Sequence, residues 1–295
     1  MVGSALMRNL QSKGFKNIVT QTSAQLDLRD QAAVNGFFDR EKPSYVFLAA
    51  AKVGGIHANN IYRAEFIYDN LMIEANIIHA AWEARVDGLL FLGSSCIYPR
   101  DCPQPIREEY LLTGPLEPTN EPYAIAKIAG LKLCESYNRQ HGAKFVAVMP
   151  TNLYGPNDNY DLESSHVLAA LLRKAHEAKA RGERKLMVWG SGTPRREFLH
   201  ANDLADACVF LMERGIGEGM FNVGIGADLS IRELVEIIMQ VVGFDGEVVF
   251  DTGKPDGTPR KLLDVTRMKA LGWTAKIDLP SGIRSTYEDL RHSLQ

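Results

Sequence analysis

The chain has 295 residues, of which 45% are hydrophobic and 23% are charged, and its formal net charge at pH 7 is −3. This composition is typical of a globular protein with one large or two moderate domains. No basic run indicates a nucleic-acid partner. No apolar stretch reaches the roughly 18 residues of a membrane span, and the start does not resemble a signal peptide, so we expect no membrane association.

The cysteines show neither the CxxC spacing nor the secretory context of a disulfide or zinc protein. We therefore expect reduced thiols, a cytoplasmic location and no metal site. The four residues concerned are Cys96, Cys102, Cys134 and Cys208.

In chain order, helix-like and strand-like segments alternate up to Pro150. The pattern predicts helices at 2–13, 30–40, 61–85 and 121–141 and strands at 17–20, 45–51, 89–94 and 145–149. This alternation favours an α/β fold with a Rossmann-type, doubly wound parallel sheet that is covered on both faces. Shorter elements follow, with helices at 165–181, 202–213, 231–242 and 283–293 and strands at 186–189, 221–223 and 248–250. We expect one domain over residues 1–150 and a smaller α/β lobe over 151–295, with some chain crossing back.

The first residues differ from the usual start of a dinucleotide-binding fold. Such folds open with a strand and a glycine-rich turn that leads into a helix. Gly3 stands where the last glycine of that turn is expected. We therefore expect that the first strand is missing, that Met1 is an internal methionine or a truncation point, and that two strand edges are left unpaired.

A tyrosine and a lysine four residues apart form the most informative motif. On a helix, Tyr123 and Lys127 stand on one face, one turn apart. An ammonium at this spacing lowers the pKa of a tyrosine from its ordinary value near ~10, and Ser94 is placed to hydrogen-bond the same substrate oxygen. Such a Ser/Tyr/Lys site transfers a proton to or from a carbonyl or an alcohol.

Taken alone, a YxxxK pair is more often a solvated helix face. Here an apolar run, Leu89 to Leu92, leads directly into Gly93, Ser94 and Ser95. A buried parallel strand delivers polar side chains to its carboxyl end in this way, and open α/β sheets bind ligands at that end. The combination resembles the extended short-chain dehydrogenases/reductases.

Longer runs resemble the GDP-L-fucose synthase family, of the bacterial type, within that group. They lie at residues 48–56, 93–99, 117–127, 149–156 and 254–261. The resemblance implies conversion of GDP-4-keto-6-deoxy-D-mannose to GDP-L-fucose. The family inverts C3 and C5 of the sugar and then reduces C4 with NADPH, and the ketone at C4 makes both neighbouring protons acidic.

The resemblance also implies catalytic roles. Cys96 would remove the C3 and C5 protons, and His166 would return protons on the opposite face. Tyr123 would protonate the C4 oxygen, Lys127 would hold the nicotinamide ribose, and Ser94 would orient the ketone. Without the resemblance, Cys96 is more simply a packing residue and His166 a residue that caps a helix.

For NADPH, the resemblance implies contacts along the strand ends and the first helix. The 2′-phosphate normally calls for an arginine, yet residues 20–23 carry no positive charge, so the preference for NADPH over NADH rests on resemblance. The expected contacts are Met1, Val2, Gly3, Ser23, Asp27, Leu28, Ala49, Ala50, Leu92, Gly93, Ser94, Ser95, Lys127, Pro150, Thr151, Asn152, Leu153 and His166.

For the sugar nucleotide, the resemblance implies Asn152, Lys174, Trp189, Arg196 and Asp256. Surface ion pairing remains the alternative for Lys174 and for Arg195. The resemblance further implies a homodimer through a four-helix bundle. Two other functions stay open: another nucleotide-sugar epimerase or dehydratase on the same scaffold, or a dinucleotide-binding protein with impaired catalysis.

Overall fold

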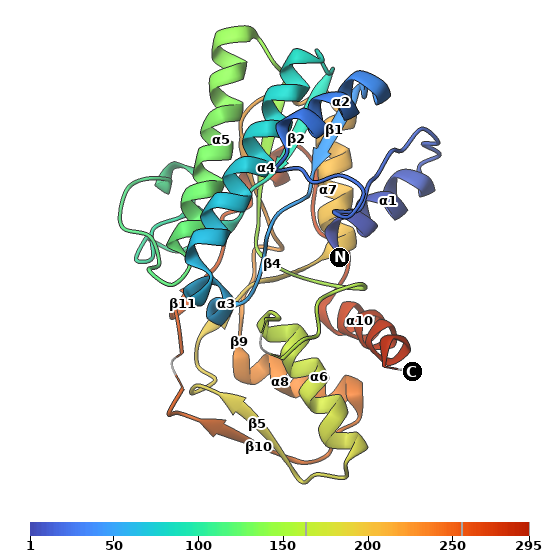
Figure 1. Ribbon diagram of the computed structural model, residues 1–295. Helices are drawn as coiled ribbons and strands as arrows, with labels where there is room; N and C mark the ends of the chain where they lie inside the picture. The colour runs from blue at the N-terminus through green and yellow to red at the C-terminus, as the bar shows by residue number, and fades with distance from the viewer. Residues whose placement is uncertain (163, 255, 295) are drawn as a thin grey trace.

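The computed structural model describes residues 1–162, 164–254 and 256–294, without the side chains of residues 56 and 57. A four-stranded parallel sheet forms the centre of the larger lobe (Figure 1). Its strands, in spatial order, are β1 (Tyr45–Leu48), β2 (Gly88–Leu92), β3 (Phe145–Pro150) and β8 (Met220–Val223). All three pairings are parallel, so the carboxyl ends of the strands meet at one edge.

Both faces of this sheet are buried, because successive side chains of each strand point to opposite sides. In β2, Leu89 and Phe91 join one core, whereas Leu90 and Leu92 join the other. Three helices complete the first core: α2 (Gln31–Glu41), α4 (Arg63–Glu83) and α5 (Glu121–His141). Three others complete the second: α1 (Val2–Ser12), α7 (Ala201–Glu213) and α9 (Thr266–Ala270). The predicted doubly wound α/β fold is therefore confirmed.

The smaller lobe lies below the sheet in Figure 1 and has its own core. Three helices build it around the parallel pair of β5 (Lys185–Trp189) and β10 (Glu247–Asp251): α6 (Val167–Ala180), α8 (Ile231–Val242) and α10 (Leu279–Ser293). Two small ladders join the lobes. They are β4 (Asn152–Tyr154) with β7 (Phe198–His200), and β6 (Arg195–Arg196) between β9 (Leu229–Ser230) and β11 (Arg260–Lys261).

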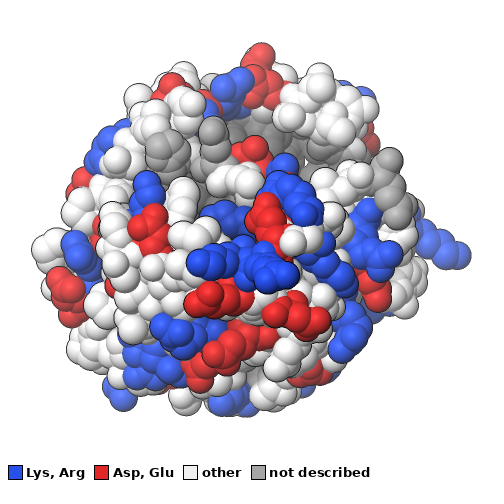
Figure 2. All heavy atoms as spheres, turned by 90° about the horizontal axis from the view of Figure 1, so that it is seen from below, with Lys and Arg blue, Asp and Glu red and all other residues white. Residues whose placement is uncertain are grey.

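Three short elements complete the architecture: α3 (Ile56–Ile61) and the 3₁₀ helices η1 (Ser95–Ile97) and η2 (Glu108–Tyr110). Among the described residues, every helix is too short or too polar to span a bilayer. On the face seen from below, acidic and basic side chains are interspersed (Figure 2).

The helix bounds follow from caps that the sequence carries. Helix α8 begins after Ser230, whose hydroxyl accepts the N–H of Glu233 while the Glu233 carboxylate accepts the N–H of Ser230, a capping box. Helix α10 begins four residues earlier than predicted, because the Asp278 carboxylate accepts the N–H of Ser281 at 2.9 Å.

One predicted strand is wrong, and two further elements have other bounds than predicted. Residues 17–20 form no strand, and Val19 is 51% exposed, because no neighbouring strand pairs with this apolar stretch. The predicted strand 45–51 ends at Leu48. The predicted helix 61–85 begins at Arg63 instead, since Tyr62, with φ −96° and ψ 45°, separates it from α3.

Candidate functional site

The end of β2 delivers Ser94 and Cys96 to the carboxyl edge of the sheet. Ser94 has an extended backbone and precedes η1, and its Oγ accepts the backbone N–H of Cys96 at 3.2 Å. This hydrogen bond turns the chain tightly after the strand. The two side chains predicted to act on the substrate therefore lie within one turn of each other.

Helix α5 brings Tyr123 to the same place. It begins at Glu121, with Pro122 in its first turn, where a residue without an N–H loses no helical hydrogen bond. The Ser94 hydroxyl is a hydrogen-bond partner of the Tyr123 hydroxyl. Burial, followed by the nearby Cys96 and Glu74, raises the pKa of Tyr123, and the Ser94 hydrogen bond only partly offsets this. The phenol is therefore a proton donor at neutral pH.

The expected lowering of the Tyr123 pKa by Lys127 is not found. The Lys127 ammonium lies 3.0 Å from Oε1 of Glu74 on α4 and donates to the carbonyl of Leu92 at 2.9 Å. It also lies 5.9 Å from the centre of the Tyr123 ring. Because a carboxylate neutralises it, its positive charge acts only weakly on the phenol.

Two polar groups contact the sulfur of Cys96. The side-chain amide of Asn120 donates to Sγ at 3.3 Å, and the ammonium of Lys261 on β11 lies 3.6 Å from it. Cys96, Asn120 and Lys261 also line one small pocket, together with Glu117 and Thr258. Cys96 is only half-buried, so its environment is polar and accessible rather than that of a packing residue.

His166 is the N-cap residue of α6, and its carbonyl accepts the N–H of Ala170 at 3.0 Å, but its imidazole makes no capping hydrogen bond. The preceding loop is held toward the sheet by the N–H of Gly55, which donates to the carbonyl of Ser164 at 2.8 Å. His166 keeps part of its surface exposed to solvent. The protein groups around its imidazole still desolvate it, and this desolvation, followed by the charge of Lys261, lowers its pKa. Lys261 therefore links Cys96 and His166.

The residues predicted to bind the dinucleotide gather along the aligned strand ends. Ala49 and Ala50 follow β1, residues 92–95 run on from the end of β2, and residues 150–153 run on from the end of β3. The loop that carries Ser23, Asp27 and Leu28 is fixed from α4, because the amide of Asn76 donates to the carbonyl of Leu28 at 2.9 Å.

The first turn of α1 fits a pyrophosphate. No side chain caps it, so the N–H groups of its first residues are free to bind an anion. A side chain at Gly3 would meet no atom within 4 Å, so backbone can approach a ligand there. The nearest arginine to this loop that could bind a 2′-phosphate is already paired. The guanidinium of Arg29 lies 2.8 Å from the carboxylate of Asp27 and 3.2 Å from that of Asp69.

The four residues predicted for the GDP moiety lie together around the end of β5. The ammonium of Lys174 lies over the ring of Trp189, 4.7 Å from its centre. The Asp256 carboxylate accepts the N–H and the hydroxyl of Ser191, two residues past Trp189. Desolvation lowers the pKa of Arg196, and the nearby charge of Asp256 offsets part of this effect. Asn152, the fifth, donates to the carbonyl of Glu197 at 2.8 Å.

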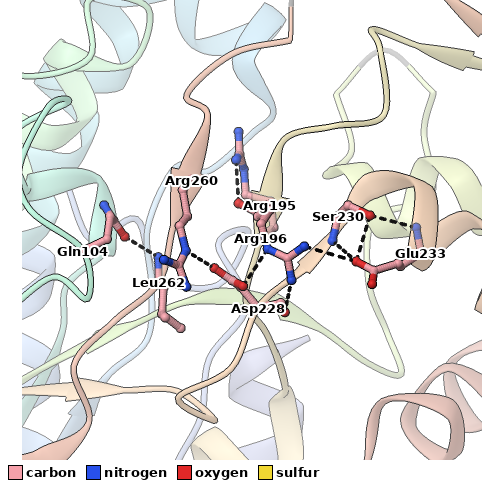
Figure 3. Close-up of polar contacts among 8 residues, drawn as sticks. All are labelled: Gln104, Arg195, Arg196, Asp228, Ser230, Glu233, Arg260 and Leu262. Carbon is pink, nitrogen blue, oxygen red and sulfur yellow. Dashed lines mark hydrogen bonds and ion pairs between the residues drawn. The ribbon is translucent and has the colours of Figure 1, made fainter.

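Arg195 and Arg196 have opposite surroundings (Figure 3). Arg195 donates to Asp228 at 2.9 Å and, with Arg260, converges on that one carboxylate. Arg196 points away from this cluster, and its guanidinium donates to the carbonyl of Arg195 at 2.8 Å. Structural ion pairing is therefore confirmed for Arg195, while the guanidinium of Arg196 has no carboxylate within ion-pair distance among the described residues.

Sequence reasoning missed Lys261, Asn120, Glu74 and Glu197. Glu197 is fully buried, and its carboxylate accepts the N–H groups of Gly226 and Leu263 at 2.7 and 3.0 Å. Its carbonyl accepts from Thr151 and Asn152. It thereby ties the end of β3 to the segment that carries Lys261. Lys261 and Asn120 stood within the runs that resemble the family, which was the available signal for them.

Comparisons with known proteins agree with this geometry. Residues 1–224 match the model of the NAD dependent epimerase/dehydratase family. The chain is 57% identical to "GDP-L-fucose synthase" of Escherichia coli (strain K12), over 98% of this chain and 92% of that protein. It is 59% identical to "GDP-L-fucose synthase 1" of Arabidopsis thaliana, over 98% and 89%.

Among solved structures, a GDP-L-fucose synthetase from Naegleria fowleri bound to NADP superposes with a TM-score of 0.91 at 29% identity, over 99% of this chain and 91% of that chain. The fold, the clustered Ser94, Tyr123 and Lys127, and these matches lead to one conclusion. The chain belongs to the NAD dependent epimerase/dehydratase family.

Proposed function

We propose that this protein converts GDP-4-keto-6-deoxy-D-mannose to GDP-L-fucose, by epimerisation at C3 and C5 followed by NADPH-dependent reduction at C4. The observation that carries the proposal is that two groups of proton-transferring residues, Cys96 with His166 and Ser94 with Tyr123, lie at one edge of the sheet. Lys261 joins Cys96 to His166, and Ser94 joins Cys96 to Tyr123. Relatives at 57–59% identity that bear the name of this enzyme support it.

The two sets divide the chemistry. For epimerisation, Cys96 takes a proton from the carbon beside the ketone, and His166 gives one to the opposite face. For reduction, Tyr123 gives its proton to the C4 oxygen, which its raised pKa suits. Ser94 orients that oxygen. A 4-epimerase has no need of a Cys96 and His166 pair, and this argues against that alternative.

NADPH would supply the hydride for C4. The first turn of α1, the strand ends and the loop of Ser23, Asp27 and Leu28 would hold it, with Lys127 and His166 at the nicotinamide end. Residues 20–23 offer no cation for a 2′-phosphate. The preference for NADPH is therefore supported by the related structure bound to NADP.

The smaller lobe, mainly residues 151–295, would hold GDP. The guanidinium of Arg196, which pairs with no carboxylate among the described residues, suits two phosphate oxygens at once, and Lys174 is a second cation for the diphosphate. The exposed ring of Trp189 offers a stacking surface for a base, with Asp256 beside it. Asn152 would contact the sugar at the junction of the lobes.

We further propose a cytoplasmic homodimer in which α4 and α5 form a four-helix bundle with those of a second copy. The two helices pack on each other and carry large apolar side chains on the open side, namely Tyr68, which is 60% exposed, and Ile125. All four cysteines are free, as in reducing compartments.

The test is a reaction in D₂O with purified protein, NADPH and GDP-4-keto-6-deoxy-D-mannose. The expected result is oxidation of one NADPH per sugar, deuterium at C3 and C5, and GDP-L-fucose as product. Inversion at C4 of a UDP-sugar without deuterium exchange would select an epimerase instead. Binding of NADPH without turnover would select the impaired dinucleotide-binding protein.

A further inference from the structure

A buried acid lies beneath the Tyr123 site, and the proposed reaction assigns it no role. Glu74 on α4 is 1% exposed, and its Oε1 lies 3.0 Å from the ammonium of Lys127, which is 2% exposed. Apart from Lys127, neither carboxylate oxygen has a hydrogen-bond partner among the described residues. The carboxylate and the ammonium therefore depend on each other.

The surrounding residues shape a niche for this pair. The Lys127 ammonium donates to the carbonyl of Leu92 at 2.9 Å and lies 4.9 Å from the centre of the Phe91 ring. Gly130 stands one turn further along α5, in the middle of the helix. A β-carbon there would come within 2.5 Å of Oε2 of Glu74, so the glycine leaves the space that the carboxylate occupies.

Stability does not account for such a pair. Burying two charges costs desolvation that their attraction barely repays, and apolar side chains of similar volume are often as stable. The pair also lies directly under the reacting groups, because the Lys127 ammonium is 5.9 Å from the Tyr123 ring. A role in setting the charge near Tyr123 explains both its burial and its position.

We propose that Glu74 is a positioning residue for the C4 reduction, whose carboxylate holds the Lys127 ammonium under Tyr123 and offsets its charge, so that the phenol keeps its proton until the C4 oxygen takes it. This inference rests on the proposed function. The other titratable groups that face the pair are Tyr123 and Cys134 on α5. Glu74 is itself among the groups that raise the pKa of Tyr123.

The test is the pH profile of kcat for NADPH oxidation in Glu74→Gln, which keeps the size of the side chain and removes its charge. Because a nearby negative charge is lost, the alkaline limb of the profile should move to lower pH by about one unit. Deuterium exchange at C3 and C5, which depends on Cys96 and His166, should keep its wild-type rate.

Glu213→Gln is the matched control, since Glu213 pairs with Lys13 at 2.6 Å on the surface between α7 and α1. It should leave the profile unchanged. Glu74→Asp keeps the charge and serves if Glu74→Gln does not fold: its alkaline limb should stay at the wild-type pH while kcat falls.

An unmoved limb in Glu74→Gln, or a displaced limb in Glu74→Asp, overturns the inference and leaves Glu74 a packing residue. A wild-type protein that oxidises no NADPH with this substrate would instead count against the proposed function, so the two failures are distinguishable.

Discussion

The ammonium of Lys261 lies 3.6 Å from the sulfur of Cys96, 165 residues earlier in the chain, and the same charge contributes to the lowered pKa of His166. Such a cation makes an imidazolium a stronger acid, which favours the return of a proton from His166. Its contact with the sulfur places Cys96 beside the same charge. The predictions below follow from this and from neighbouring contacts.

Replacing the thiol tests the epimerising set on its own. In Cys96→Ala, deuterium exchange into C3 and C5 should fall by roughly 10²- to 10⁴-fold, the usual contribution of a general base. Proton NMR of the sugar in D₂O measures this directly. Cys102→Ala is the control, because burial raises the pKa of Cys102 and so keeps its thiol protonated. Exchange at the wild-type rate in Cys96→Ala would remove Cys96 from the mechanism.

The cation between the two groups should affect both. In Lys261→Met, the pKa of His166 should rise, because one of the two effects that lower it is removed while desolvation remains. Exchange at C3 and C5 should slow by about tenfold, as expected on losing a charge-assisted hydrogen bond. NMR titration of the imidazole gives the first quantity. An unchanged His166 titration would show that Lys261 acts on the sulfur alone.

Tyr123→Phe should separate the two halves of the reaction. The phenol proton is needed only when C4 is reduced, so NADPH oxidation should fall by roughly 10²- to 10⁴-fold. Deuterium exchange should continue, since Cys96 and His166 remain. In the wild type, burial raises the pKa of Tyr123, so the reduction rate should not decline between pH 7 and 9 from loss of this proton. Loss of exchange together with reduction in Tyr123→Phe would contradict this division.

The two adjacent arginines should behave differently. In Arg196→Ala, KM for the GDP-sugar should rise by roughly tenfold or more with a smaller change in kcat, because a charge-assisted contact to the diphosphate is lost. Arg195→Ala is the matched control: its guanidinium is bound to Asp228, so KM should change little. Equal KM values for the two variants would argue against Arg196 as a phosphate ligand.

Asp228 should make stability depend on acid pH. Burial works to raise its pKa, but hydrogen bonds from Arg260 and Arg195 outweigh burial and hold the pKa below its ordinary value. Its contribution is therefore complete above the unfolded pKa near ~3.9 and is lost as pH falls through the lowered native value.

Urea unfolding measures this contribution. Asp228→Asn should lower the free energy of unfolding at pH 7 by about 1–2 kcal/mol, a modest figure because the two guanidiniums are 42% and 44% exposed. The loss should shrink toward pH 3. A deficit that stays constant with pH would show that the variant disturbs packing rather than the ion pairs.

The alternating fold and most of the residues at the sheet edge were predictable from the order of the residues. Helices α5 and α8 match their predicted bounds, because apolar spacing and caps are local signals. Ser94 and Tyr123 were identified from a strand end and a helix motif, which are also local, whereas the role of Cys96 came from the resemblance.

The ion pairs around these residues, and the pairing of short apolar stretches, depend on contacts between distant parts of the chain. No local pattern shows that Glu74 neutralises Lys127 or that Lys261 approaches Cys96, since the paired residues come from separate elements that only the packed fold brings together. Residues 17–20 read as a strand, yet form none, because a strand exists only when a neighbour takes up its backbone hydrogen bonds.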